Sequence, residues 1–260
     1  MIDVPLKKGA PVSFVAARIL VVGFGSLAVA WALLTFPIFW RQSALEQIER
    51  HIIAGDSFKT AALVPERPTF VELGKDKWSR PSVLSAAAVI DLHLLEQAIT
   101  DSDLKNLDTL MSETDGMIRK SLANSPADPF LWTVLFWLEN TQNGFNRTHL
   151  KYLQMSYFLG PNEGWIAVKR NRFALAIYSA LSPDLAENTV SEFSRLVGSN
   201  YFAEAADILS GPGWPIHDTL LAGLKDVDEV NRQTFAKIVY KLGYDVLVPG
   251  IERPDWRPWH

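Results

Sequence analysis

The chain has 260 residues, no cysteine and a formal net charge of −4, and 48% of its residues are hydrophobic. The absence of cysteine excludes disulfides and thiolate metal sites. The acidic balance argues against general nucleic-acid binding, which needs a basic face to displace counterions from phosphates. The length is ample for one sizeable hydrophobic core.

The first element is the uncharged stretch at residues 19–40, which reads ILVVGFGSLAVAWALLTFPIFW. As a helix it would be about 33 Å long, enough to cross a hydrocarbon core of roughly 30 Å. One alternative is a cleaved signal peptide, because Ala28-Val29-Ala30 is a small-residue cleavage site. However, the apolar run continues to Trp40, so cleavage after Ala30 would leave residues 31–40 exposed at the new N-terminus. The other alternative is a buried core helix, but core helices are seldom apolar all round. The stretch therefore predicts an uncleaved, single-pass membrane anchor.

The orientation of this anchor follows from its flanks. Residues 1–18 form a short leader containing Lys7, Lys8 and Arg18, and three basic residues also follow the span soon after Trp40. The two flanks carry equal numbers of basic residues, and the added charge of the free amino terminus favours a cytoplasmic N-terminus. Long domains that follow a span are translocated largely regardless of their charge. We expect a bacterial inner-membrane protein with a cytoplasmic leader and a large periplasmic domain.

Residues 41–81 are predicted to be a juxtamembrane helix and a linker. Leu45, Ile48 and Ile52 recur at helical spacing, so the membrane helix is expected to continue a few turns beyond the bilayer. The prolines and mixed charges of residues 54–81 are typical of a linker or an extended wrap.

From residue 82 to residue 247 the hydrophobic period is helical almost throughout, and no run alternates in the manner of a strand. The predicted fold class is all-α. Residues 82–99 carry two apolar faces, which is typical of a helix buried between neighbours. Proline-containing dipeptides divide the rest into short helices, whose expected core stripes are Leu104, Leu107, Met111, Ile118 and Leu122; Ala186, Val190, Phe193 and Val197; Ile216, Leu220 and Leu224; and Val227, Val230, Ile238 and Leu242.

The best-patterned unit runs from Ser125 to Pro161. It places a tryptophan and a leucine on its first helix, aromatic and apolar residues on its second, and a proline at its end: Pro126, Trp132, Leu135, Phe136, Tyr152, Met155 and Pro161. This resembles a tetratricopeptide repeat, which is a 34-residue helical hairpin. Phe136 and Glu139 depart from the small residue and the tyrosine of that pattern. Degenerate units extend the resemblance over residues 104–209.

The resemblance implies stacked helical hairpins with a concave surface, although a generic helical bundle uses similar spacings. An anchored chain of such helices is similar to accessory proteins of bacterial cell-envelope assembly and exopolysaccharide export. Within the hairpin, Asp128 is expected to cap the first helix with Pro129 at its first position. Trp132, Leu135 and Phe136 are expected to face the second helix, where they would meet Leu153, Tyr157 or Phe158.

Sequence signals for chemistry are few. The chain has no HExxH, G-x-S-x-G, P-loop or G-x-G-x-x-G motif, so the sequence assigns no catalytic residue, cofactor site or metal site. Asp91, His93 and Glu96 would bring an imidazole near a carboxylate on one helix, but a solvated or capping pair is the simpler interpretation. Asn146 begins a glycosylation triplet and is more simply a helix cap.

Two groups of residues are candidates for partner binding. Lys169, Arg170 and Arg172 form a basic cluster in an acidic domain, suited to a partner's C-terminal carboxylate or an acidic glycan. The alternative is a solvated helix face paired with nearby acids. The extended tail at residues 248–260 carries Trp256 and Trp259, which are expected to dock on the chain's own helices or on a partner.

Together these features predict a non-enzymatic, membrane-anchored helical scaffold or adaptor that contacts other envelope proteins. One alternative is an accessory structural subunit of a larger integral membrane complex, in which the span itself is the interface. Another is a glycan-active enzyme, because the two carboxylates of such an enzyme leave no local signature.

Overall fold

The computed structural model describes residues 11–53, 63–68, 72, 80–100 and 107–252. Within these residues every regular element is a helix, which confirms the all-α fold class. The α-helices are α1 (Pro11–Ile53), α4 (Pro81–Thr100), α5 (Leu107–Asn124), α6 (Pro129–Asn143), α7 (Leu150–Leu159), α8 (Gly164–Ala176), α9 (Pro183–Gly198), α10 (Phe202–Ser210), α11 (His217–Ala222) and α12 (Glu229–Lys241). Short 3-10 turns join several of them: η1 (Val64–Glu66), η2 (Arg147–His149), η3 (Tyr178–Ala180), η4 (Trp214–Ile216) and η5 (Gly223–Asp226).

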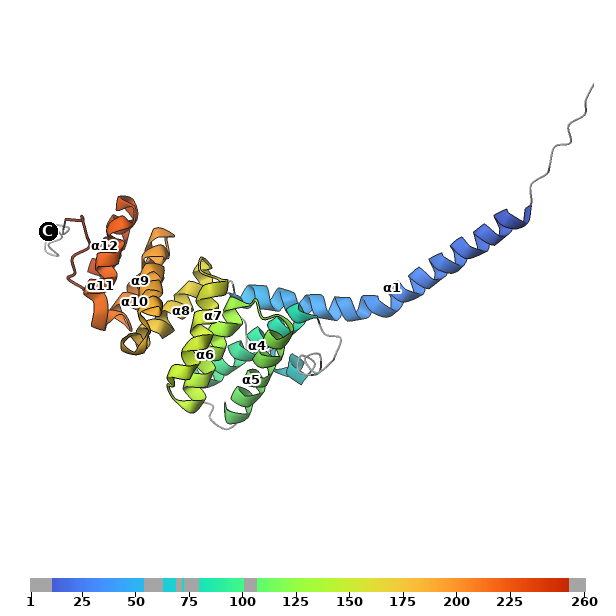
Figure 1. Ribbon diagram of the computed structural model, residues 1–260, viewed down its shortest axis with the longest axis horizontal. Coiled ribbons are helices and arrows are strands. Elements are labelled where there is room, and N and C mark those ends of the chain that lie inside the picture. Colours follow the sequence, from blue (N-terminus) through green and yellow to red (C-terminus); the bar gives the residue numbers. More distant parts are fainter. Residues whose placement is uncertain (1–10, 54–62, 69–71, 73–79, 101–106, 253–260) are drawn as a thin grey trace, which may run out of the picture.

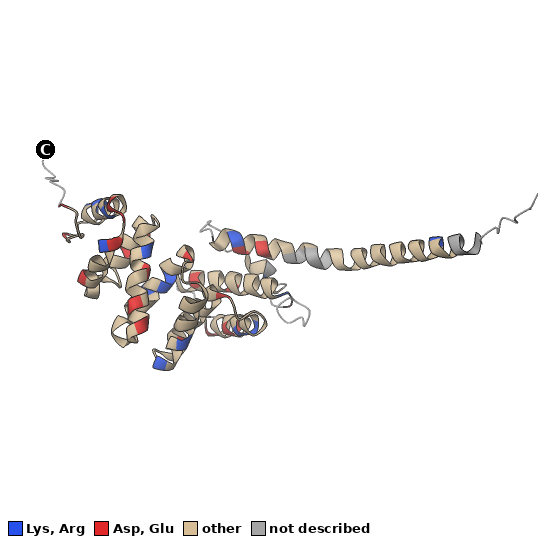
Figure 2. Cartoon of the chain, turned by 45° about the horizontal axis from the view of Figure 1, so that its top comes forward, with Lys and Arg blue, Asp and Glu red and all other residues tan. Residues whose placement is uncertain are grey.

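Helix α1 is 43 residues long and extends well past the apolar stretch at both ends. Its segment Ala16–Phe36 has a mean hydropathy of 2.2, and no part of it is buried by the rest of the chain. This segment projects from the other helices (Figure 1) and is uncharged over most of its length (Figure 2). By length and composition, α1 is able to cross a membrane.

The second half of α1 packs against the other helices. Leu45 is buried there, and Ile48 and Ile52 lie against the same hydrophobic cluster. Ser82 Oγ donates to Glu46 Oε1 at 2.7 Å, and Ser85 Oγ lies 3.1 Å from Glu49 Oε1. Both pairs are offset by 36 residues, so α1 and α4 run in the same direction.

Helix α4 is the central helix of the first hydrophobic cluster. It is also apolar enough to cross a membrane, with a mean hydropathy of 1.4, but 61% of its apolar window is buried inside the protein. It packs against α1 and α5. The burial of both Leu84 and Ile90 confirms that the two apolar faces of this helix are covered by neighbours.

The α6–α7 hairpin begins as the sequence predicts. Asp128 Oδ1 accepts hydrogen bonds from the backbone N–H groups of Phe130 and Leu131, both at 3.0 Å, and Pro129 begins α6. A carboxylate here satisfies two N–H groups that lack helical partners. Asn146 likewise caps η2 through the backbone N–H of Thr148 at 2.9 Å.

The packing of Trp132 differs in part from the prediction. Its indole is only partly buried, stacks on Tyr152 of α7 at 5.9 Å and donates to the carbonyl of Pro126 at 2.8 Å. Phe136 is the residue that joins the cluster of Leu153 and Tyr157. The expectation that Phe158 faces α6 is wrong, because its side chain is 78% exposed.

The core stripe predicted for α12 is also partly wrong. Val230 and Leu242 are exposed, whereas Phe235, Ala236 and Val239 are buried. Val230 lies in the first turn and Leu242 at the C-terminal cap, so neither lies where the neighbouring helices cover α12. The buried face is instead centred on Phe235, whose ring packs edge-on against that of Phe193 in α9.

Three hydrophobic clusters follow one another along the chain. The first joins α1, α4, α5 and α6, the second lies mainly between α6, α7, α8 and α9, and the third joins α8–α12 and the segment after them. The helices therefore form an elongated array in chain order, with α12 at the end farthest from the projecting part of α1 (Figure 1).

Candidate functional site

The predicted basic cluster does not converge on one site. Lys169 Nζ pairs with Glu96 of α4 at 2.7 Å, and Arg172 forms an ion pair with Asp207 of α10. Arg170 is fully buried and pairs with Glu192 of α9. The three cations thus point to three different helices, and the buried Arg170 is inaccessible to a partner molecule.

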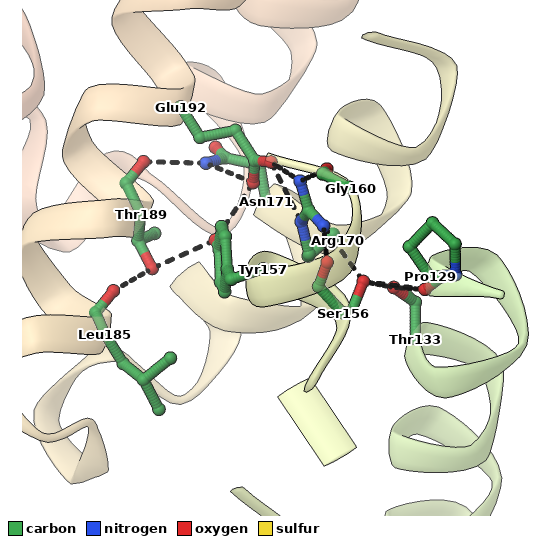
Figure 3. A network of polar contacts seen from close by, with 10 residues as sticks. All are labelled: Pro129, Thr133, Ser156, Tyr157, Gly160, Arg170, Asn171, Leu185, Thr189 and Glu192. Carbon is green, nitrogen blue, oxygen red and sulfur yellow. Dashed lines mark hydrogen bonds and ion pairs between the residues drawn. The ribbon is translucent and has the colours of Figure 1, made fainter. Parts of the chain in front are cut away.

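Arg170 is the centre of a buried polar network (Figure 3). Its Nε and Nη2 atoms donate to Glu192 Oε1 at 2.9 and 2.5 Å. Nη1 donates to the carbonyl and hydroxyl oxygens of Ser156 at 2.8 and 2.9 Å, and Nη2 also donates to the carbonyl of Gly160 at 2.9 Å. The guanidinium carbon lies 4.2 Å from the centre of the Tyr157 ring. Every face of this cation therefore has a partner within the chain.

The second oxygen of Glu192 is also satisfied. Tyr157 donates its hydroxyl to Glu192 Oε2 at 2.9 Å, and Asn171 Nδ2 lies 3.4 Å from the same oxygen. Burial, and then the negative charge of Glu192, raise the pKa of Tyr157 well above its usual value, so the phenol stays protonated and remains a donor. Burial also raises the pKa of Glu192, and the charge of Arg170 opposes this rise.

The network reaches four helices. Ser156 Oγ donates to the carbonyl of Pro129 in α6 at 2.7 Å and lies 2.7 Å from the hydroxyl of Thr133. On the other side, Asn171 donates to the carbonyl of Thr189 in α9 at 2.8 Å. Because misplacing any of these helices would leave a buried charge or hydroxyl without its partner, the network favours one packing of α6, α7, α8 and α9.

A pocket of about 290 Å³ lies beside this network, between the start of α8 and the end of α9. Glu192 forms part of its inner wall, but the Glu192 oxygens are engaged by Arg170, Tyr157 and Asn171. The outer wall carries Arg195, Ser199 and Tyr201 as well as Asn162. Arg195 is exposed, and none of the ion pairs among the described residues includes it. The outer wall is therefore suited to an anionic or hydrogen-bonding group, whereas the inner wall is structural.

The Asp91–His93–Glu96 group does not form a site. Asp91 is buried and pairs with Arg67 at 3.0 Å, while Glu96 pairs with Lys169. His93, Glu96 and Lys169 share the wall of a small cavity of about 70 Å³. His93 Nε2 has no hydrogen-bond partner there. Among the described residues, no group of three or more histidine, aspartate or glutamate side chains is arranged to hold a metal ion.

Trp256 and Trp259 lie outside the described residues. The segment just before them packs on the chain's own helices, because Val246 and Val248 are buried in the cluster that includes Phe235. Tyr240 of α12 also donates its hydroxyl to the carbonyl of Val246 at 2.8 Å.

The sequence signal for the buried pair lies in helical spacing. Ile166 and Ala174 are both buried, and each lies four residues from Arg170, so the period of α8 points Arg170 inward. The adjacent charges of Lys169 and Arg172 mask this inward placement in the sequence. Glu192 carries no comparable sequence signal, because its partner Arg170 lies 22 residues away on another helix and no local pattern connects the two.

No protein-family model matches this chain, and no curated protein or solved structure matches it significantly.

Proposed function

We propose that this protein is a membrane-anchored helical scaffold or adaptor in a bacterial cell-envelope or polysaccharide-export assembly. The observation that supports this most directly is the apolar segment Ala16–Phe36, which the rest of the chain leaves wholly uncovered. A surface of this size and hydropathy is stable in a bilayer and costly in water. We propose that this segment spans the membrane once, with the leader in the cytoplasm and the array in the periplasm.

The array supports the scaffold part of the proposal. Its helices follow one another in chain order, and buried side chains link neighbours from α4 to α12. We propose that these helices are degenerate tetratricopeptide-like hairpins that present a surface to other envelope proteins. The buried pair of Arg170 and Glu192 contributes rigidity to this surface, because the polar atoms of both side chains already have partners within the chain.

We propose that Arg195 binds an acidic group of the partner, such as a carboxylate of an envelope protein or an acidic glycan. Arg195 lines the pocket between α8 and α9 and forms no ion pair with a described acidic side chain. Replacing it in Arg195→Glu is expected to abolish co-isolation of the partner. Arg172→Glu is the control, because Arg172 is also exposed but already pairs with Asp207. An unchanged partner yield for Arg195→Glu would remove this pocket from the proposal.

Two experiments test the proposal as a whole. First, residues 16–36 are replaced by an unrelated span of equal length, and the partners are isolated from mild detergent. A scaffold keeps its partners, whereas an accessory subunit that assembles through its span loses them.

Second, because the chain has no cysteine, the variant Asp218→Cys carries a single thiol at an exposed position. A membrane-impermeant maleimide should label it in spheroplasts, and protection until the cells are broken would reverse the proposed orientation.

A further inference from the structure

At the contact between α1 and α4, two carboxylates lie within hydrogen-bond distance of a single hydroxyl. Ser85 Oγ lies 3.1 Å from Glu49 Oε1 and 3.0 Å from Asp128 Oδ2. A serine hydroxyl has a single hydrogen, so it can donate to only one of these oxygens at a time. With both carboxylates ionised, the other oxygen would face the lone pairs of the hydroxyl. With one proton added, the chain of donors and acceptors is complete.

The geometry decides which carboxyl group carries the proton. Asp128 Oδ1 already accepts two backbone N–H groups of α6, an arrangement that favours the charged form. Among the described residues no backbone N–H donates to Glu49, and a protonated Glu49 can donate to Ser85 Oγ while Ser85 donates to Asp128. We propose that Glu49 of α1 holds a proton that completes a Glu49–Ser85–Asp128 chain, and that loss of this proton weakens the docking of α1 on α4 and α6.

The charges around Glu49 agree with this assignment. Burial raises the pKa of Glu49 to about 7, and the charges of Asp128 and Glu46 add to the rise against the pull of Arg50. A hydrogen bond donated by Ser85 to Glu49 acts in the opposite direction. This effect is absent whenever Ser85 donates to Asp128 instead.

The expected pH dependence follows from proton linkage. The folded protein holds a proton on Glu49 between its ordinary pKa of 4.5 and about 7, whereas the unfolded chain does not. Because the folded state binds more protons in this interval, the contribution of Glu49 to stability falls as the pH rises from about 4.5 to about 7, and then levels off. Glutamine at position 49 keeps a donor without a charge, so Glu49→Gln should not show this fall.

The test uses the full chain in detergent micelles and measures its melting temperature between about pH 5 and pH 8.5. Wild type and Glu49→Gln should melt at similar temperatures at pH 5, and the variant should melt a few degrees higher at pH 8.5. Comparison of the two cancels the contributions of other titrating groups. The control is Glu187→Gln in α9, an exposed carboxylate that is not among the charges acting on Glu49, and it should keep the wild-type pH profile. A difference between wild type and Glu49→Gln that is the same at every pH would overturn the proposal.

A second variant and a second readout separate this proposal from a general loss of stability. Asp128→Asn keeps an oxygen to cap α6 but removes the opposing charge, so the pH midpoint should move downward by about one pH unit. Spin labels at Gln47→Cys in α1 and Ser112→Cys in α5 report the separation of these helices directly. The distance distribution should broaden above pH 7 in the wild-type background and not with Glu49→Gln. An unmoved midpoint or a pH-independent distance would contradict the shared proton.

Discussion

The ring of Tyr201 occupies the space beside Gly164 that a side chain would need. A Cβ atom on residue 164 would lie 2.7 Å from Cε2 and 2.9 Å from the hydroxyl oxygen of Tyr201. Both residues line the pocket beside the buried network. The close approach of α8 to the start of α10 therefore depends on a glycine at the first position of α8.

We predict that Gly164→Ala lowers the free energy of unfolding by about 1–3 kcal/mol, because Tyr201 or α8 must shift to relieve the overlap. Chemical denaturation followed by circular dichroism measures this change. Gly116→Ala in α5 is the control, since nothing lies within 4 Å of a Cβ built there. That variant should instead gain about 0.5–1 kcal/mol from the higher helix propensity of alanine. Equal effects of the two variants would contradict the contact.

The buried ion pair should be far more sensitive to single substitutions than to a double one. Arg170→Met leaves Glu192 buried and uncompensated, and is expected to cost about 3–5 kcal/mol. The double variant Arg170→Met/Glu192→Leu should recover much of this loss, because no isolated charge remains. Denaturation of the three proteins at one pH provides the measurement.

The matched control is the exposed ion pair of Arg172, which lies on the same helix as Arg170. Arg172→Met breaks the ion pair with Asp207, whose side chain is 66% exposed. We expect a change below about 1 kcal/mol, since solvent screens such pairs. A similar cost for Arg170→Met would mean that the buried network contributes little to stability.

For Trp132 we predict an intermediate cost of truncation. Loss of a fully buried large side chain costs about 3–5 kcal/mol, but Trp132 is only partly covered, so Trp132→Ala should cost about 2–3 kcal/mol. Phe158→Ala, at an exposed position of the neighbouring helix, should change stability by less than about 0.5 kcal/mol. Retained stability with lost partner binding would instead assign Trp132 to the binding surface.

A pH prediction of opposite sign to that for Glu49 concerns Glu139 in α6. Partial burial raises its pKa, but hydrogen bonds from Asn143 and Arg119 outweigh this and hold the pKa below the ordinary value of 4.5. A lowered folded-state pKa stabilises the protein above about pH 4.5, and this contribution is lost as the pH falls further. Glu139→Gln should therefore destabilise the protein at pH 7 more than at pH 3.5, by less than about 1 kcal/mol. The reverse order at the two pH values would refute the assignment.

Local signals predicted the helices better than they predicted how charges pair. The Asp128 cap with Pro129, and the ends of α5, α7 and α10 just before proline-containing turns, follow from chemistry within a few residues. The burial of α4 follows from its two apolar faces. These features depend on neighbours in sequence, which a single chain displays directly.

The partners of Arg170 and Lys169 could not be predicted in this way. Glu192 and Glu96 lie on other helices, 22 and 73 residues away, and many acids in the chain are equally plausible by sequence. The exposure of Val230 and Leu242 has a similar cause, because the buried face of α12 is set by where α9 and α10 lie. Tertiary packing selects among periodic stripes that look equivalent in the sequence.

Helix α1 runs without a break from the apolar segment into the contacts of Leu45 and Glu49. The number of residues between the two therefore fixes how the array is rotated about the helix axis relative to the apolar segment. Each residue of an α-helix turns the chain by about 100° and advances it by 1.5 Å. A single residue inserted between Phe36 and Leu45 would therefore rotate the whole array by about 100° relative to the apolar segment and move it only about 1.5 Å farther along the helix axis. An insertion of seven residues would nearly restore the original bearing at a height about 10 Å greater. In the proposed membrane-anchored arrangement, the length of this short connecting stretch therefore sets which flank of the array faces a neighbouring membrane protein.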